Sequence, residues 1–389
     1  MVPPAIDHPG NNPEHEPNPS PRRRQLNCLV QGVSNFLKGQ NEKPQSPASV
    51  AVAPYKKAAR WIPRVVSPFT DFPTVFRLGM RADIDPEFDN GANLGNDIHI
   101  TSDPAVQEKH LQIYRTILTL VPGFSDMLTE YQFTPESLPD LLRLFDILLK
   151  STRSDDIKSI RNDGISYLHK TPHTIITPRI RLESGTRKDD RGWDHLLTAR
   201  LMCPLKLLQE YEADPERFCR RVMEGEIVIR ASDLPVYLFP EGTVYNPNAL
   251  TARIFQGHVI VRVYRHIFTS PASVWSPGSR TKGRKSKGDK HQMNRSCARS
   301  IAYAALQARH MMSSVEQWSD PAFDGTFSYE QYYNNLCRLL ETNPDLPWVK
   351  ETLRFYDREV FLDAGNTRNN AIEELPEGND IDAILGLVE

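Results

Sequence analysis

Two groups of polar residues in this chain have side chains whose types and spacing could do chemistry. The first is a basic stretch, residues 280–290, in which six cations meet a single anion and two glycines. Flexible lysines and arginines bind phosphates by releasing counterions, with little sequence preference. The stretch is therefore a candidate nucleic-acid-binding segment, and the alternatives are a solvated loop or a nuclear-import signal. Its candidate contact residues are Arg280, Lys282, Arg284, Lys285, Lys287 and Lys290.

The second group begins just after residue 190. Asp194 and His195 precede Cys203 closely, which could supply a nucleophile and its base. Cys203 lies before a proline in an apolar run, however, so we favour a buried and unreactive thiol. A catalytic site would require these residues to share a concave surface with polar residues from later in the chain. The candidate polar site comprises Arg191, Trp193, Asp194, His195, His266 and Arg309.

Metal and cofactor motifs are missing from the sequence. His169 and His173 have the spacing of two ligands on one helical face, but Pro172 between them is expected to break that helix. The five cysteines are odd in number and widely spaced, which argues against a zinc ribbon and a disulfide framework. The segment 278–283 has the glycine spacing of a phosphate-binding loop, but the required Lys and Ser/Thr do not follow. We expect no metal, no cofactor and no motif-encoded catalytic residue.

The composition is that of a soluble globular protein. Of the 389 residues, 39% are hydrophobic and 25% are charged, and the formal net charge is −2. Because a nucleic-acid binder usually has a basic excess over its domain, such a function would have to be local here. The N-terminus lacks the pattern of a secretory signal, and no apolar run has the length of a membrane span. We expect an intracellular protein, cytoplasmic or nuclear, that does not enter a membrane.

The N-terminal half divides into an arm and a helical region. Residues 1–73 carry 13 of the 31 prolines and few bulky apolar residues, which predicts a mostly disordered arm with one short helical pattern at 24–38. Residues 75–170 show helical periodicity. The pattern predicts a helix from Pro104 to about 131, broken near residues 121–123, and further helices from Ser137 onward.

The second half is mainly helical with one exception. The segments 226–230 and 235–239 are rich in β-branched and aromatic residues, and the short connection predicts a β-hairpin. Helices are predicted over 247–268 and 296–316, on either side of a flexible basic loop at 278–295. Two further helices follow, over 328–341 and 346–361, and residues 365–389 form an acidic tail.

Several strings in the second half carry a resemblance when they are taken together and in order. They are Arg191–His195, Leu201–Pro204, Gly225–Arg230, Tyr264–Pro271 and Ser300–Arg309. In that order the chain resembles an uncharacterised domain family expanded in mushroom-forming (basidiomycete) fungi, over residues 185–362. Where family members have Thr-Gly-Arg, this chain has Thr-Ala-Arg with Ala199, so a tight glycine turn is not expected there. The resemblance implies a domain boundary and an intracellular fungal origin, and it implies no activity.

The sequence therefore predicts a mainly α protein. Its multi-helix domain contains a small β-hairpin and follows a disordered, proline-rich arm. The leading interpretation is a non-enzymatic interaction module with a protein partner, because no catalytic motif is found and the two ends of the chain differ in character. The alternatives are a nucleic-acid-associated protein that uses residues 280–290 and a cryptic enzyme with a site near residues 191–195.

Overall fold

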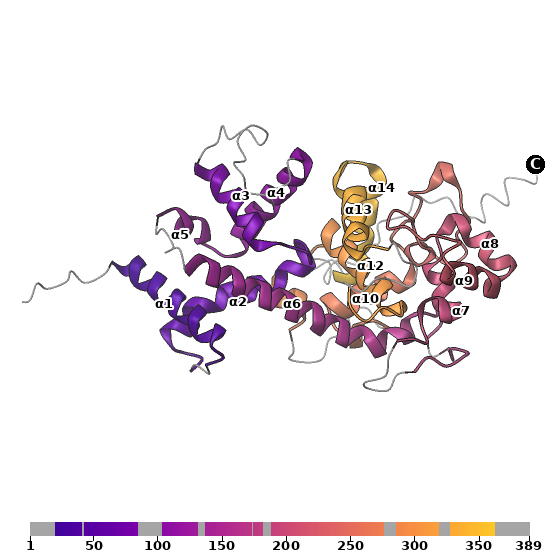
Figure 1. The fold of residues 1–389 in the computed structure, drawn as a ribbon, viewed down its shortest axis with the longest axis horizontal. Helices are drawn as coiled ribbons and strands as arrows, with labels where there is room; N and C mark the ends of the chain where they lie inside the picture. The colour runs from indigo at the N-terminus through magenta and orange to yellow at the C-terminus, as the bar shows by residue number, and fades with distance from the viewer. Residues whose placement is uncertain are drawn as a thin grey trace, which may run out of the picture. The chain divides into compact units, whose positions relative to one another are not determined.

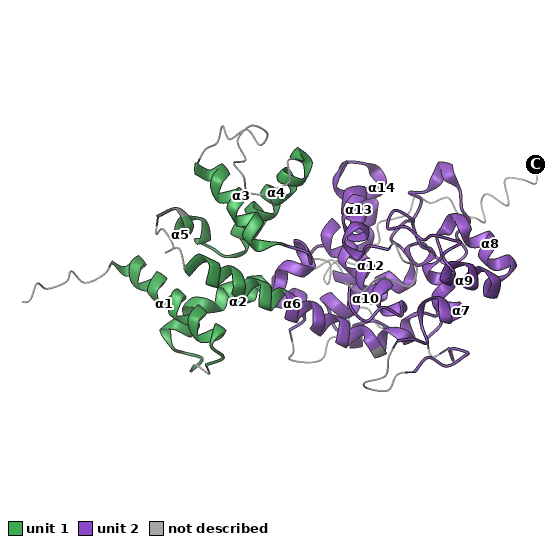
Figure 2. Cartoon of the chain, in the orientation of Figure 1, with its two compact units in different colours: residues 1–60, 71–149 green, residues 61–70, 150–389 purple. Residues whose placement is uncertain are grey.

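The computed structural model describes residues 20–40, 43–84, 103–130, 137–172, 174–181, 188–275, 285–318 and 327–361. Throughout these ranges the chain is mainly helical and forms no β-strand (Figure 1). The chain divides into two compact units, residues 1–60 with 71–149 and residues 61–70 with 150–389 (Figure 2). Two helices cross the division, so that each contributes residues to both units.

The first unit is built from helices whose starts are encoded locally. Ser20 caps α1 and Asp103 caps α4, and each is followed by a proline at the first helical position. The sequence prediction of a helix starting at Pro104 and breaking near 121–123 is confirmed, because α4 ends at Leu120 and α5 begins at Phe124. The helices of this unit are α1 (Pro21–Leu37), α2 (Pro47–Val65), α3 (Phe72–Ile84), α4 (Pro104–Leu120), α5 (Phe124–Glu130) and the first half of α6 (Ser137–Asp163).

An aromatic cluster holds the first unit together. Phe124 lies at its centre, with ring centroids 5.1 Å from Tyr55, 5.8 Å from Phe76 and 6.2 Å from Phe145. The pairs with Tyr55 and Phe145 are edge-to-face, and such pairs are favourable beyond the area that they bury. These rings come from α2, α3, α5 and α6, so the cluster fixes four helices to one another.

The second unit contains the remaining elements, many of them short. The α-helices are α7 (Leu196–Met202), α8 (Leu208–Ala213), α9 (Pro215–Met223), α10 (His258–Phe268), α11 (Lys287–Lys290), α12 (Ala298–Met312), α13 (Tyr329–Glu341) and α14 (Pro347–Tyr356). Short 3₁₀ turns connect them: η1 (Gly164–Tyr167), η2 (Gly192–Asp194), η3 (Leu205–Leu207), η4 (Val236–Leu238), η5 (Pro247–Ala249) and η6 (Pro271–Ser273). The π-helical turn η7 (Asp357–Phe361) follows α14.

Two helices form the centre of the second unit. Every residue of α10 from Val259 to Phe268 is buried, and so is every residue of α12 from Ser300 to Met312. A helix that is covered on all sides must satisfy its polar side chains inside the protein. Each buried polar residue of α10 and α12 therefore has either a structural hydrogen-bonding role or a functional one, and its partners decide which.

The predicted β-hairpin at 226–239 is wrong. The backbone on either side of Pro235 pairs with the segment after α7: the Leu205 N–H donates to the Leu234 carbonyl and the Val236 N–H to the Cys203 carbonyl, both at 2.9 Å. The hydrogen-bonding groups that a hairpin would need are therefore already used. Residues 226–230 begin with a bend, in which the Glu226 and Ile227 N–H groups donate to the Arg221 carbonyl, and they have no strand partner in the described structure.

The predicted helix at 247–268 is also corrected, because only its second half is an α-helix. Asn246 caps η5 as expected, but Arg253 and Phe255 have positive φ angles of 56° and 66°, which interrupt the helix. α10 then starts after Gly257, where a Cβ atom would lie 2.0 Å from the Tyr237 carbonyl oxygen. Only glycine permits this close approach of two backbones.

The expectation of a disordered arm over residues 1–73 is wrong for the part that the structure describes. Residues 21–37 and 47–65 are helical and bury Leu29, Val33, Val52 and Tyr55. Pro21 and Pro47 are the first residues of α1 and α2, where proline favours a helix start. Residues 1–19 and the acidic tail at 365–389 lie outside the described residues.

Candidate functional site

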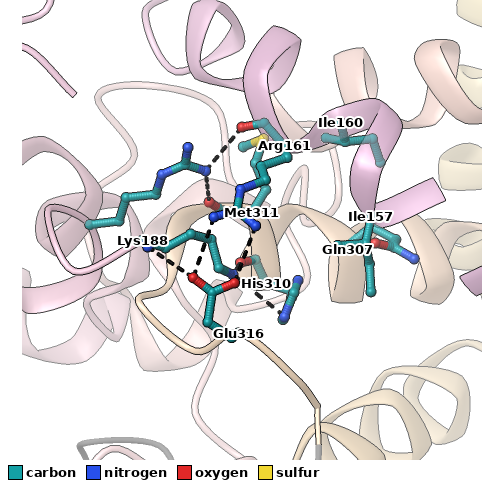
Figure 3. Close-up of a pocket in the computed structure, with 9 residues that line it drawn as sticks. Ile157, Ile160, Arg161, Lys188, Gln307, His310, Met311 and Glu316 are labelled. Carbon is teal, nitrogen blue, oxygen red and sulfur yellow. Dashed lines mark hydrogen bonds and ion pairs between the residues drawn. The ribbon is translucent and has the colours of Figure 1, made fainter. Parts of the chain in front are cut away.

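A small cavity in the second unit is lined by an unusual number of cations. Arg161 of α6, Lys188 and Arg191 of the segment before α7, and His310 of α12 line it together with Glu316. Ile157, Ile160, Gln307 and Met311 complete the wall (Figure 3). The cavity volume is about 20 Å³, which is room for roughly one water molecule.

Glu316 is the single carboxylate in this wall, and it joins two of the cations. Its oxygens lie 3.2 Å and 3.4 Å from the two terminal nitrogens of Arg161, in a fork arrangement. The Lys188 backbone N–H donates to Glu316 Oε1 at 3.0 Å. Figure 3 shows the Glu316 carboxylate between these two residues. The carboxylate thus occupies a position where N–H donors converge from α6 and from the segment before α7.

The Lys188 side chain is turned toward α12. Its Nζ donates to the His310 carbonyl oxygen at 2.9 Å and lies 3.5 Å from His310 Nε2. Burial of the ring lowers the pKa of His310 well below its ordinary value, and the neighbouring Lys188 lowers it further. His310 is therefore neutral at physiological pH, and the charges in the wall are three cations against one carboxylate.

Arg191 is almost fully buried, with an exposed fraction of 2%. Its Nη1 donates to the carbonyl oxygens of Arg161 and Met311, both at 3.0 Å. Burial lowers the pKa of Arg191 to about 10. Its Nε is buried without a hydrogen-bond partner among the described residues. The nearby carboxylates of Asp190 and Glu316 favour the charged guanidinium, but they offset the effect of burial only in part.

The other residues near 191–195 do not line this cavity. Trp193 is buried, with its ring 6.3 Å from that of Phe218. His195 caps α7: its Nδ1 accepts from the Leu197 N–H at 3.2 Å, and its Nε2 donates to the Pro178 carbonyl at 2.8 Å. Asp194 is exposed. Of these four residues, the structure brings Arg191 alone to the cavity.

His266 of α10 lies instead between two hydroxyl groups. Ser159 Oγ is 2.7 Å from its Nε2, and the Tyr167 hydroxyl is 2.8 Å from its Nδ1. A serine, a histidine and a third group in this order are the parts of a nucleophilic triad. Burial, however, lowers the pKa of His266 to about 4 and raises that of Tyr167 above its usual range. A neutral phenol does not supply the negative charge that would stabilise the imidazolium formed by proton abstraction. We therefore interpret the hydrogen-bonded row Ser159–His266–Tyr167 as structural.

Arg309 of α12 packs among aromatic rings. Its guanidinium lies 3.5 Å from the centre of the Phe327 ring and 5.9 Å from that of Tyr332. The exposed fraction of Arg309 is 3%. Cation–π contacts of this kind stabilise a buried guanidinium. The six residues of the candidate polar site are thus dispersed over several environments of the second unit.

The second unit matches a protein-family model over most of its described length. The model of a family of unknown function, DUF6698, matches residues 148–361, which is more than half of the chain. The chain belongs to the DUF6698 family. No curated protein and no solved structure matches it.

The DUF6698 region begins earlier than the resemblance at 185–362 suggests. It includes the second half of α6 and η1, which supply Arg161, Ser159 and Tyr167. Its first residue, 148, lies two positions before the main segment of the second unit, which starts at 150. All nine residues that line the cavity fall within the DUF6698 match.

The basic stretch of the DUF6698 region is only partly described. Arg280, Lys282 and Arg284 lie outside the described residues. The part from 285 onward is not a flexible loop: Ser286 starts α11 with a capping box, and the Lys287 ammonium lies 2.9 Å from Asp156 Oδ1. Lys285 and Lys290 are exposed. At least one candidate phosphate contact is thus an internal ion pair.

Asp156 is the centre of a buried charge network in the DUF6698 region. Its exposed fraction is 0%, and Arg64 donates to its two oxygens at 2.8 Å each. The Tyr303 hydroxyl donates to it at 3.0 Å. Burial by itself would raise the pKa of Asp156, but Arg64 and Lys287 outweigh that effect and lower it. The Asp156 carboxylate is therefore charged, and both of its oxygens accept hydrogen bonds.

Two larger hollows lie in the first unit, and all of the residues that line them precede the DUF6698 match. We call the first, of about 710 Å³, the α1–α2 groove; its wall is formed by α1, α2 and the turn between α4 and α5. The second, of about 560 Å³, lies between α3 and the start of α6. The residues of the α1–α2 groove are Arg22, Gln25, Cys28, Pro47, Val50, Ala51, Pro54, Tyr55, Val121, Pro122, Gly123, Asp126 and Met127.

Over the described ranges, no cluster of three or more His, Cys, Asp or Glu side chains has the arrangement to hold a metal ion. Among the helices of the same ranges, none has both the length and the apolar character that crossing a bilayer requires.

Proposed function

We propose that the protein is a non-enzymatic interaction module whose α1–α2 groove binds a helical segment of a partner protein. The observation that supports this proposal is the contrast between the hollows of the two units. The polar residues of the DUF6698 region surround a cavity of about 20 Å³, whereas the α1–α2 groove has a volume of about 710 Å³. Ligand sites in proteins span roughly 300–1,000 Å³.

The wall of the α1–α2 groove is mostly apolar and has a fixed floor. Val50 is 60% exposed, although it is an aliphatic side chain in the middle of a hollow. Tyr55 at the floor is buried, and its hydroxyl donates to Met127 Sδ at 3.3 Å while its ring packs edge-to-face on Phe124. A rigid apolar floor loses little conformational entropy when a ligand binds.

The occupant we infer is the apolar face of an amphipathic helix. Polar wall residues of the groove come from α1 and α5, as Arg22, Gln25 and Asp126, and α2 contributes mainly apolar side chains. Such a groove matches a ligand with one apolar face and polar edges. The described residues offer no strand edge for β-augmentation, and one aromatic ring is too few for a proline-rich ligand.

Val50→Asp is expected to weaken binding of such a helix by at least about tenfold, because a carboxylate would be desolvated against the apolar face of the ligand. The full-length protein would first be used to select 16-residue peptides from a displayed library. The best peptide would then be titrated by fluorescence anisotropy against the wild type and the variant. Selected peptides should carry apolar residues at i, i+3 or i+4, and i+7.

The matched control is Val244→Asp, since Val244 is 83% exposed and lies in the second unit. It should leave the dissociation constant unchanged. Equal binding by the wild type and Val50→Asp, or a selection without helical peptides, would count against the α1–α2 groove as the docking surface. Both variants replace exposed side chains, so their thermal midpoints should stay within a few degrees of the wild type.

Ser159 is expected to be unreactive toward a fluorophosphonate probe, which labels serines that a neighbouring base activates. The reason is the low pKa of His266 together with its neutral partner Tyr167. The full-length protein would be treated with the probe, and labelling would be read by intact mass. Labelling that disappears in both Ser159→Ala and His266→Gln would show a catalytic serine and overturn the non-enzymatic proposal.

A further inference from the structure

The cationic cavity beside Glu316 has the composition of an oxyanion-binding site. The Glu316 carboxylate of the protein itself occupies the position that a bound anion would take. Arg161, Lys188 and Arg191 converge on it, and Glu316 supplies the one carboxylate. The Arg191 side chain is 98% buried, since its exposed fraction is 2%, and its Nε has no hydrogen-bond partner among the described residues. A buried donor without a partner needs an explanation, because most buried polar groups are satisfied.

We propose that this cavity binds inorganic phosphate and that Glu316 closes it by occupying the position of two phosphate oxygens. The Glu316 carboxylate already accepts from the Arg161 fork and from the Lys188 backbone N–H. A tetrahedral oxyanion that replaced it would keep these donors. Its further oxygens would enter the volume of about 20 Å³ that one water could fill, toward the wall that contains Arg191.

The exposure of the residues involved shows how an exchange could occur. The side chain of Glu316 is 40% exposed and that of Arg161 is 29% exposed, whereas Lys188 and Arg191 are buried. The carboxylate can therefore swing into solvent, while the deeper cations stay in place. Phosphate carries more negative charge than one carboxylate, so it compensates three cations better than Glu316 does.

The occupant is free phosphate rather than a phosphate ester, because of the size of the space. The carboxylate and the adjoining one-water volume together provide room for a tetrahedral anion. An ester whose organic part pointed inward would have to displace Ile157, Ile160 or Met311 of the wall, and an ester whose organic part pointed outward past Glu316 is the case that O-phosphoserine tests below. This inference is independent of the α1–α2 groove, and the failure of either proposal leaves the other standing.

The test compares the full-length wild type with Glu316→Gln, which keeps the size of the side chain and removes its charge. Isothermal titration with inorganic phosphate would be done in a phosphate-free buffer, with chloride added to keep the ionic strength constant. Glu316→Gln is expected to bind phosphate at least about tenfold more tightly than the wild type, because the competing carboxylate is gone. Phosphate should also raise its thermal midpoint more than that of the wild type.

The double variant Glu316→Gln/Arg161→Gln is the matched control, since it removes the fork that both anions would use. It should lose the gain in affinity. Equal dissociation constants for the wild type and Glu316→Gln would overturn the proposal, and so would an unchanged gain in the double variant. O-phosphoserine should bind Glu316→Gln more weakly than phosphate; tighter binding would exclude free phosphate as the occupant. Glu316→Ala provides a second removal of the carboxylate if the glutamine variant is poorly folded.

Discussion

Replacing Asp156 by Asn is expected to lower the free energy of unfolding of the second unit by about 3–5 kcal/mol. The substitution removes the charge on which Arg64 and Lys287 converge, and it leaves two cations around a site with an exposed fraction of 0%. Losing one partner of a buried pair costs more than the pair contributes, since the other charge is then uncompensated. Urea denaturation would measure the effect.

Tryptophan fluorescence is the appropriate signal for this experiment. The five tryptophans are Trp61, Trp193, Trp275, Trp318 and Trp348, and all of them belong to the second unit. Asp155→Asn is the matched control, because Asp155 is exposed and adjacent in sequence. It should change the free energy of unfolding by less than about 0.5 kcal/mol. Similar effects of the two substitutions would show that the network around Asp156 does not stabilise the unit.

Lys287 provides an intermediate case between Asp156 and its control. Its side chain is 39% exposed, so part of its charge is already hydrated, and Lys287→Gln should destabilise the unit less than Asp156→Asn. A protein that used Lys287 mainly for nucleic acid would show the opposite pattern, with unchanged stability and weaker, salt-dependent binding.

Acidification from pH 6.5 to pH 4 is expected to destabilise the second unit by roughly 3 kcal/mol through His266 alone. The pKa of His266 is about 4 in the folded chain because the ring is buried, and the ordinary value is about 6.5. Between these values the unfolded chain binds a proton that the folded chain does not. The contribution of His266 to stability is therefore complete above pH 6.5 and is lost as the pH falls toward 4.

His310 and His258 add to this dependence in the same direction. Burial lowers the pKa of both residues, and His258 is held by the Leu168 carbonyl oxygen at 2.9 Å from its Nε2. The free energy of unfolding, measured by urea denaturation at several pH values, should thus rise steeply with pH over this range. His266→Gln should reduce the slope by up to about one proton per molecule.

His169→Gln is the control for the pH experiment, since His169 is only half-buried at the surface. It should leave the slope nearly unchanged. A slope that His266→Gln does not alter would contradict the assignment of this proton to the buried ring. The fluorescence signal comes from the five tryptophans, all of which belong to the second unit.

The sequence predicted well those elements whose ends are encoded locally. The helix start at Pro104 and the break near 121–123 need only the neighbouring residues to act. Within the predicted arm, residues 21–37 and 47–65 were mispredicted because proline occurs both in disordered segments and at helix starts. At Pro21 and Pro47 it starts a helix, yet in a composition count it indicates disorder.

The elements that were predicted wrongly depend on residues that are distant in the sequence. Whether residues 234–236 pair with 226–230 or with 203–205 depends on which backbone reaches them, and both have suitable side chains. The late start of α10 reflects positive φ angles at Arg253 and Phe255, two residues that rarely adopt them. No local pattern indicates such a turn.

Most residues of the cationic cavity beside Glu316 could not be predicted from the sequence either, because they come from distant segments. Arg191 was singled out, but Lys188, His310, Arg161 and Glu316 were not. Arg161 and Glu316 are 155 positions apart in the sequence, so no spacing rule could join them. His310 directly follows Arg309, which was chosen in its place, although the two side chains have different surroundings: His310 lines the cavity and Arg309 packs on Phe327. Because α12 is buried on all sides, its sequence has no polar face that would distinguish His310 from its neighbours.

The short segment 61–70 has a consequence for how the chain folds. It lies outside the DUF6698 match, yet Arg64 pairs with Asp156, 92 positions later, and the Val66 carbonyl accepts from Tyr333, 267 positions later. During synthesis this segment emerges long before its partners do, and contacts of such sequence separation form slowly. The second unit can therefore reach its native state only after Tyr333 has been synthesised, and until then Trp61 and Ile62 are exposed apolar side chains that a chaperone could bind.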